Sequence, residues 1–314
     1  MEHAYDNAFR TMEMDCPKLL NPVVNEVFHE NYPLDARVEI FPNEQMITTP
    51  EDEQIIRITD SNFMVIGNQR VKYHIECESN PDSQELLIRM FQYDMQIVLN
   101  NVEMEDGKMF VEVPKSAVVY LRYTKNTPDM LQMVIRDGDQ ELIREIPVIK
   151  IQEYSLDSIF EKHLLFFLPF YVFIHEKELS LYNKNEEKRK NLMDEYKSII
   201  CRLEELYYVG KIDEMEKQCI ITSSREVLRL LAKKYRKVIE EGERVMGGEL
   251  LDYPAKRSYR EGMAVGREEG RESTLTLHVT KLLSKHMSCE EVADLLDLDI
   301  DKVKEIEKNM MTLN

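Results

Sequence analysis

The dipeptide Gly67-Asn68 lies between two segments rich in apolar and β-branched residues, and this arrangement constrains the fold more than any other feature of the sequence. A short turn of this kind joins antiparallel strands in a hairpin. We therefore expect strands over residues 55–66 and 71–79, paired with each other through the turn. Such a hairpin brings side chains that are distant in sequence close together in space.

The second predicted strand alternates charged and apolar residues. Because successive side chains on a strand point to opposite faces, one face carries His74, Glu76 and Glu78. The other face carries Ile75 and Cys77. We expect the apolar pair to face the core and the charged set to line a cleft.

Asp60, on the first predicted strand, is expected to approach Glu76 across the hairpin, which places three carboxylates together with that of Glu78. Carboxylates in one place repel one another unless cations or protons compensate them. Mg²⁺, with Mn²⁺ as a substitute, suits such a set because it prefers oxygen ligands and leaves positions for water or a substrate phosphate. A bound ion of this kind activates water for phosphodiester hydrolysis. The alternative is that the three acids are solvated residues on a polar sheet face.

The segments around the hairpin predict a mixed α/β core. Apolar residues recur at helical spacing over residues 7–29, with a break near Pro17, and again over about 84–100. Further strands are expected over residues 117–124, 130–136 and 141–151. The fold class is therefore α/β, with a sheet flanked by helices.

From about residue 156 the pattern changes to helices, with long charged segments and then a linker indicated by Gly247-Gly248 and Pro254. The expected organisation has four parts, which are a core over 1–155, a helical region over 156–243, a Gly/Glu/Arg segment over 244–272 and a small helical tail over 273–314.

Composition limits the classes of function. The 314 residues carry a formal net charge of −18, which repels nucleic acid, so contact with DNA requires a local basic surface or a metal ion. Five cysteines without a CxxC pair argue against a zinc knuckle or a disulfide framework and suit a reducing cytoplasm. The most apolar run, residues 164–174, contains Pro169 and is too short to cross a bilayer. We expect it to be a buried helix or bend, and we expect no signal sequence and no membrane role.

Two features near the C-terminus bear on self-association. Gly262, Gly266 and Gly270 recur every fourth residue, which suits either close approach of a second helix or a solvated, charged linker. The tail from Ser288 predicts a short helix, a tight turn and another short helix, as in a helix-turn-helix. Its second helix mixes acids with lysines and is a poor surface for a DNA groove, which favours a helical cap or a homo-oligomerisation element.

Several short motifs resemble a known family in their order and spacing. They are Tyr5-Asp6-Asn7-Ala8-Phe9-Arg10, Asn25-Glu26-Val27-Phe28, Arg57-Ile58-Thr59-Asp60, Tyr73-His74-Ile75-Glu76-Cys77-Glu78, Ile88-Arg89-Met90-Phe91-Gln92-Tyr93-Asp94 and Leu168-Pro169-Phe170-Tyr171. With the glycine-punctuated segment and the tail, the likeness covers nearly the whole chain. On these motifs the sequence resembles the PD-(D/E)XK nuclease-like proteins described as recombination-promoting nucleases and transposases.

The resemblance implies a restriction-endonuclease-like fold that hydrolyses DNA with a metal ion. It implies that Asp60 and Glu76 are metal ligands and that the backbone carbonyl of Cys77 completes the protein's share of the coordination. Glu78 departs from the pattern, because the family usually has Lys or Gln there. A lysine lowers the pKa of the attacking water and offsets negative charge. Glu78 is suited instead to act as a general base or to help hold a second cation, or it marks a site that has lost activity.

Other residues belong to the predicted surroundings of this site. Glu26 matches a position where many members of the superfamily carry an additional acid, and a solvated helix glutamate is the alternative. His74 is either an auxiliary residue or a structural histidine. Arg89 is expected to contact a phosphate or a site carboxylate, whereas Asp94 is expected to cap or pair within the fold.

The sequence therefore predicts a cytoplasmic, Mg²⁺-dependent DNA endonuclease, linked to recombination or mobile elements, with Asp60, Glu76 and Glu78 as its catalytic residues. Hydrolysis of RNA uses the same metal chemistry, although no site that reads a 2′-hydroxyl is indicated. The alternative is a catalytically inactive protein of the same fold that serves as a binding or oligomerisation module.

Overall fold

The computed structural model describes residues 4–41, 44–48, 54–58, 61–79, 85–99, 102–247, 276, 279–283, 287–295, 300, 302–304 and 306–307. The chain divides into two compact units, Met1–Leu251 and Asp252–Asn314, and each is described by itself.

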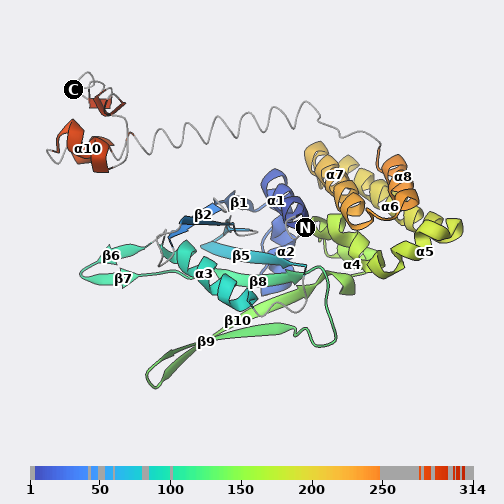
Figure 1. Ribbon diagram of the computed structural model, residues 1–314, viewed down its shortest axis with the longest axis horizontal. Helices are drawn as coiled ribbons and strands as arrows, with labels where there is room; N and C mark the ends of the chain where they lie inside the picture. The colour runs from blue at the N-terminus through green and yellow to red at the C-terminus, as the bar shows by residue number, and fades with distance from the viewer. Residues whose placement is uncertain are drawn as a thin grey trace. The chain divides into compact units, whose positions relative to one another are not determined.

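A six-stranded mixed sheet forms the centre of the first unit (Figure 1). Its strands, in spatial order, are β1 (Arg37–Ile40), β4 (Phe63–Ile66), β5 (Arg70–Glu78), β8 (Lys115–Tyr120), β10 (Gln140–Lys150) and β9 (Met130–Asp137). The first three strands pair antiparallel, β8 is parallel to both β5 and β10, and β9 is antiparallel to β10. The expected mixed α/β core is confirmed.

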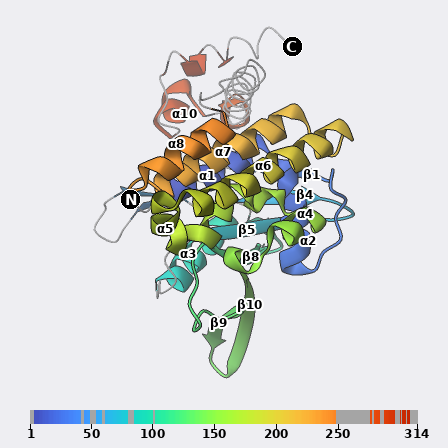
Figure 2. The ribbon, with the colours of Figure 1, turned by 90° about the vertical axis from the view of Figure 1, so that its right-hand side faces the viewer.

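Helices cover both faces of this sheet (Figure 2). In the larger hydrophobic core, one face of the sheet packs against helices from the beginning and the end of this unit. Its residues include Phe9 of the first helix, Ile75 of β5, and Phe166 and Ile220 of the later helices. A smaller cluster, which includes Met90 and Val118, packs one helix against the opposite face. The helices of this unit are α1 (Ala4–Asp15), η1 (Pro17–Leu19), α2 (Leu20–Phe28), α3 (Leu86–Leu99), η2 (Ile151–Glu153), α4 (Leu156–Glu161), η3 (Leu165–Glu178), α5 (Leu179–Lys184), α6 (Glu186–Tyr208), α7 (Glu214–Leu231) and α8 (Arg236–Val245).

The predicted hairpin is present, but its first strand is shorter than expected. β4 and β5 pair from Phe63–Tyr73 to Ile66–Arg70, around a turn in which the Gly67 amide donates to the Gln69 carbonyl at 3.1 Å. A Cβ atom at Gly67 would lie 2.9 Å from Tyr32 Cε1, so this close approach favours glycine. The expected strand over residues 55–66 is two strands, because residues 54–58 form β3 and pair with a different partner. The separate pairs are β2 (Glu44–Thr48) with β3 (Gln54–Ile58), and β6 (Glu103–Glu105) with β7 (Lys108–Phe110).

The apolar run that contains Pro169 is buried, as expected. It forms most of η3, a 3₁₀ stretch whose Phe166 ring meets the ring of Phe9 edge-on at a centroid distance of 4.9 Å. The burial of this run therefore joins the helical region to the N-terminal helix in one core. Within the described part of the chain, no helix combines the length and the apolar character that a bilayer crossing requires.

The second unit is helical in its described residues. Its helix α10 (Cys289–Leu295) follows Ser288, whose carbonyl accepts the amide of Val292 at 3.0 Å. Buried residues of the tail form a cluster of their own, namely Val279, Cys289, Val292, Ala293, Val303 and Ile306. The repeated glycines Gly262, Gly266 and Gly270 lie outside the described residues.

Candidate functional site

Side chains of β5 alternate between the two faces of the sheet, as the sequence predicts. Ile75 and Cys77 are buried in the larger core. On the opposite face, His74 and Glu78 contact Asp94 and Arg89 of α3. These side chains were expected to be exposed in a cleft, but they are buried. The exposed fractions are 0% for His74, 2% for Glu76 and 7% for Glu78, so α3 covers a face that was expected to line an open cleft.

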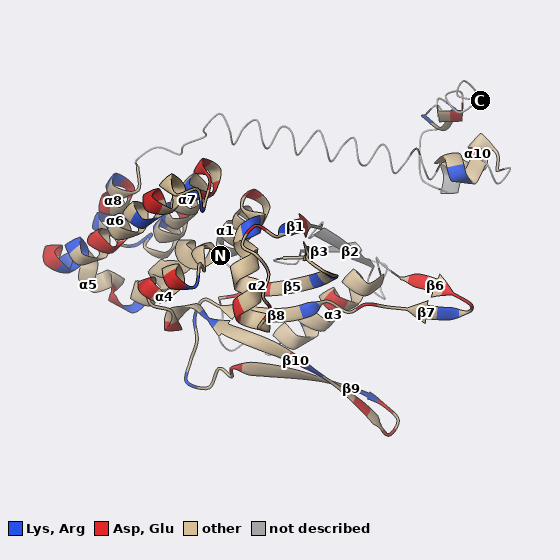
Figure 3. Cartoon of the chain, turned by 180° about the vertical axis from the view of Figure 1, so that it is seen from behind, with Lys and Arg blue, Asp and Glu red and all other residues tan. Residues whose placement is uncertain are grey.

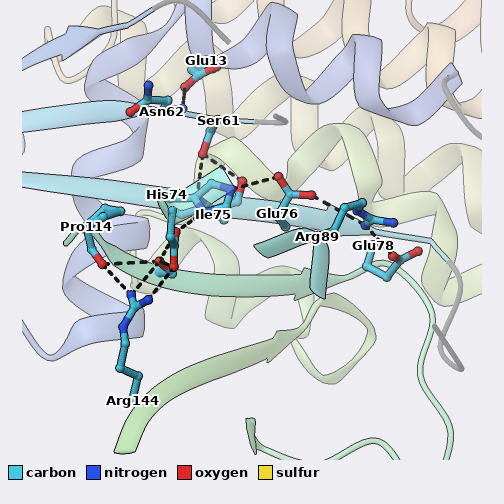
Figure 4. Close-up of polar contacts among 12 residues, drawn as sticks. Glu13, Ser61, Asn62, His74, Ile75, Glu76, Glu78, Arg89, Pro114 and Arg144 are labelled. Atoms are coloured by element: carbon cyan, nitrogen blue, oxygen red, sulfur yellow. Dashed lines mark hydrogen bonds and ion pairs between the residues drawn. The ribbon is translucent and has the colours of Figure 1, made fainter. Parts of the chain in front are cut away.

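A buried polar network lies between β5 and α3 (Figure 4). Its members come from β5, α3, β8 and β10, and they are His74, Glu76, Glu78, Arg89, Asp94, Ser116 and Arg144. The parallel register pairs His74 with Ser116, which brings β8 into the network although it is more than forty residues away in sequence.

His74 is the centre of this network. Its Nδ1 atom lies 2.7 Å from Asp94 Oδ1, and its Nε2 atom lies 2.9 Å from Glu76 Oε1. Burial alone lowers the pKa of His74, but the hydrogen bonds and negative charges of Asp94 and Glu76 outweigh it and raise the pKa to about 10. The imidazole is therefore protonated at neutral pH and donates from both nitrogens. In this state it has no free lone pair with which to act as a base.

Asp94 collects donors from three different elements. Besides His74, the Ser116 hydroxyl donates to its two carboxylate oxygens at 2.8 and 2.9 Å, and Arg144 Nη1 donates at 2.8 Å. The expected pairing of Asp94 within the fold is confirmed. Ser, His and Asp are the components of a hydrolytic triad, but Ser116 donates to the aspartate and not to the imidazole. The arrangement therefore holds Asp94 in place and does not activate a nucleophile.

Arg89 contacts site carboxylates, which is one of the two roles expected for it. Its Nη2 atom lies 3.0 Å from Glu78 Oε2 and 3.6 Å from Glu76 Oε2. Its side chain is 33% exposed, so the guanidinium lies between the buried acids and the surface of the molecule.

Among the seven described members of the network, the charges balance. Glu76, Glu78 and Asp94 supply three negative charges, and protonated His74, Arg89 and Arg144 supply three positive ones. The repulsion among clustered carboxylates that suggested a metal ion is thus offset here by side chains of the protein itself.

Glu26 does not belong to this network. Its Oε1 atom accepts hydrogen bonds from the Tyr154 hydroxyl at 3.0 Å and from Lys162 Nζ at 2.6 Å. These partners tie α2 to the helical region. The hydrogen bonds of Glu26 therefore run to the helical region and not to the network, and its auxiliary role at the site stays a prediction. The alternative was a solvated helix glutamate, whereas the Glu26 side chain is only 25% exposed and paired with Lys162.

A different acid, Glu13 on α1, lies beside Asn62, one residue before β4. It is fully buried, and its Oε1 atom accepts the amide of Asn62 at 3.1 Å. The Ser61 hydroxyl bridges the Ile75 amide and carbonyl, both at 2.9 Å, one residue from Glu76. The sequence carried a signal for Glu13, because an acid next to Met12 on an apolar helix stripe needs buried partners.

The structure tests the predicted ligands Asp60 and Cys77 only in part. Asp60 lies outside the described residues, and its neighbour Ser61 is the first described residue of this segment. The Cys77 side chain is 5% exposed and packs in the core, so only its backbone is available for the role assigned to it. Over the described residues, which exclude Asp60, no group of three His, Cys, Asp or Glu side chains is arranged to hold a metal ion.

Comparisons with protein-family models, with curated proteins and with solved structures found no match to this chain. The relation to PD-(D/E)XK nucleases therefore stays a prediction from the motifs of the sequence.

Proposed function

We propose that the protein is a metal-dependent nuclease of the PD-(D/E)XK type that hydrolyses phosphodiester bonds of DNA at the carboxyl end of β5. The observation that carries the proposal is the position of Glu76 and Glu78. The two acids lie at the end of a central strand, within an order of helix, antiparallel hairpin, helix and parallel strand. The residue pattern predicts the order of helix, hairpin, helix and strands, and the motif resemblance implies the role of Glu76 as a metal ligand.

In the proposed site, each residue would have a separate role. Asp60, Glu76 and the Cys77 carbonyl would hold Mg²⁺, or Mn²⁺ in its place. When bound, the ion supplies activation of water and neutralisation of charge on the phosphate. His74 orients Glu76 through the 2.9 Å contact of Nε2. Arg89 supplies a positive charge beside Glu78, where the family usually has Lys or Gln.

The proposed localisation, biological role and choice of nucleic acid rest on separate observations. All five cysteines are free, in keeping with a reducing cytoplasm. A link to recombination or mobile elements rests on the motif resemblance alone. RNA is a substrate of the same metal chemistry, so both nucleic acids belong in any assay.

Nicking of supercoiled plasmid by the wild-type protein and by Glu76→Gln tests the proposal. We expect nicking in Mg²⁺ or Mn²⁺ by the wild type and a loss of at least about 100-fold in the variant, because a neutral amide is a poor ligand for a hard cation. Glu26→Gln is the matched control, since Glu26 has its own partners away from the network, and it should retain wild-type activity. Asp60→Asn should behave as Glu76→Gln does.

Metal binding is measured separately, by the rise in the thermal unfolding midpoint with added Mg²⁺ or Mn²⁺. Absence of nicking by the folded wild type in both ions, or equal nicking by wild type and Glu76→Gln, would contradict the catalytic proposal.

One observation favours a second candidate, a non-catalytic protein of the same fold. Arg89 contacts both Glu76 and Glu78, so an ion bound to these two acids would have to compete with its guanidinium. A folded wild type that shows neither nicking nor a metal-dependent midpoint would favour this candidate.

A further inference from the structure

The last strand of the sheet, β9, has an open edge. Within the described part of the chain its only strand neighbour is β10, with which it forms eight consecutive pairs from Asp137–Gln140 to Met130–Pro147. Its outward backbone donors and acceptors are therefore available to a further strand. An edge of this length is a template for pairing with another chain.

β9 also lacks the features by which proteins usually protect an edge strand. Its sequence, Met-Leu-Gln-Met-Val-Ile-Arg-Asp, contains neither proline nor lysine, and the continuous register leaves no bulge. Its two charged residues, Arg136 and Asp137, have opposite signs and lie at the tip end of the strand (Figure 3). The strand is therefore locally neutral in a chain whose net charge is −18.

The β9–β10 ribbon extends beyond the support of the sheet (Figure 2). β8 pairs with β10 only over Val148–Lys150, so residues 140–147 of β10 pair with β9 alone. A two-stranded ribbon is marginally stable in water by itself. α3 covers one face near the base, where Met133 packs in the smaller cluster and Arg144 reaches Asp94.

The other face of the ribbon carries an exposed apolar pair between two polar pairs, Arg136 with Glu141 and Gln132 with Glu145. Met133 and Arg144 are a register pair that faces α3, so the adjoining pair, Val134 and Ile143, faces the opposite way. Val134 is 45% exposed and Ile143 is 53% exposed. Val134 lies on the open edge strand, and Ile143 lies directly across from it on β10.

We propose that β9 is a homodimerisation edge, at which a second copy of the chain adds its own β9 in antiparallel orientation. Two identical strands related by a two-fold axis present the same surface to each other, so every contact is made twice. With the axis at Val134, the exposed pair becomes one apolar row across four strands, Ile143 and Val134 of each copy. In the same register Gln132 lies opposite Arg136 of the second copy, and no like charges face each other along β9.

The occupant is a second copy because self-pairing satisfies the apolar row and the backbone edge together. The net charge of −18 on the whole chain opposes self-association in general, whereas the eight residues of β9 carry no net charge. This interface is distinct from the C-terminal segments that the sequence singles out for assembly.

The mass of the full-length protein in solution, measured by light scattering over a range of concentrations, tests the proposal. We expect the wild type to be dimeric and Val134→Lys to be monomeric, because the variant places two ammonium groups beside the axis. Leu142→Lys is the matched control. Leu142 is 60% exposed on the same ribbon but lies on β10, away from the edge, so this variant should remain dimeric.

Disulfide trapping tests the same contact by a gain of dimer, so a variant that merely fails to fold cannot imitate the expected result. In a Cys201→Ser background, which removes the exposed native thiol, we expect Val134→Cys to form a covalent dimer under mild oxidation. Ile143→Cys should not, because the two copies of Ile143 would be three strand spacings, about 14 Å, apart. The proposal would be overturned by a monomeric wild type or by a Val134→Lys variant that dimerises as strongly as the wild type. It would also be overturned if the dimer were lost only on removal of the tail. A wild type that is monomeric alone and pairs with a strand of another protein would overturn it as well.

Discussion

Single residues set the charge of the buried polar network, and His74 has the largest effect. Its two hydrogen bonds run to carboxylates, so the network is most stable with the imidazole protonated. Its alternating position on the strand follows from the sequence. Its charge does not, because its partner Asp94 lies on α3, 20 residues further along the chain, and is itself bound by Arg144 of β10.

The raised pKa of His74 predicts a specific dependence of stability on pH. The pKa is about 10 in the folded protein and about 6.5 in an unfolded chain, so the stabilisation is complete below about pH 6.5 and is lost as the pH rises toward 10. Between these values the free energy of unfolding should fall by about 1.4 kcal/mol per pH unit. Urea unfolding from pH 6 to 9 measures this slope.

His74→Gln should lose this component of the slope and should be less stable than the wild type at pH 6, where Asp94 and Glu76 lack their charged donor. His29→Asn is the control, because His29 is exposed and its positive φ of 55° is tolerated by asparagine. Equal slopes for the wild type and His74→Gln would show that the imidazole is neutral in the folded state.

At the level of elements, strong local signals located most of the sheet and its helices. The turn at Gly67 and the stripe of α3 are such signals. The β6–β7 hairpin was missed although Asp106-Gly107 is a turn signal, with φ of 47° and 73°. Its strands are three residues each and exposed, so they lack the alternation that marks a half-buried strand. The division of residues 55–66 into β3 and β4 was missed because β3 pairs with β2, in a hairpin that was not predicted from the sequence.

The packing of α8 against α7 predicts an unusual effect of an alanine. In an exposed helix, Gly→Ala stabilises by about 1 kcal/mol. Gly242 of α8 is buried, and a Cβ there would lie 2.3 Å from Cδ2 of Leu228, which is itself 1% exposed. We therefore expect Gly242→Ala to lower the free energy of unfolding by about 1–3 kcal/mol, as overpacking does.

A double-mutant cycle with Leu228→Ala isolates this contact. In the Leu228→Ala background the added methyl group has room, so Gly242→Ala should become neutral or stabilising there. If Gly242→Ala destabilises both backgrounds equally, its effect does not arise from the contact with Leu228.

On the scale of the whole molecule, the chain consists of two compact units with separate apolar clusters. The core of Met1–Leu251 includes residues on both sides of position 155, from Ile75 of β5 to Ile220 of α7. The change from mixed to helical patterning along the sequence therefore does not coincide with a gap in the core. The cluster of the tail is built from its own residues, such as Val292 and Val303.

Separate clusters predict that the first unit folds without the second. A chain that ends at Leu251 should keep the thermal unfolding midpoint of the full-length protein within about 2 °C, because it retains every residue of the larger core. Near-ultraviolet circular dichroism should show the same tyrosine environment in both chains. A shortened chain that unfolds at a much lower temperature would show that the tail stabilises the first unit. A shortened chain that keeps its midpoint but loses self-association would assign assembly to the C-terminal segments, as the repeated glycines of the sequence suggest, and not to β9.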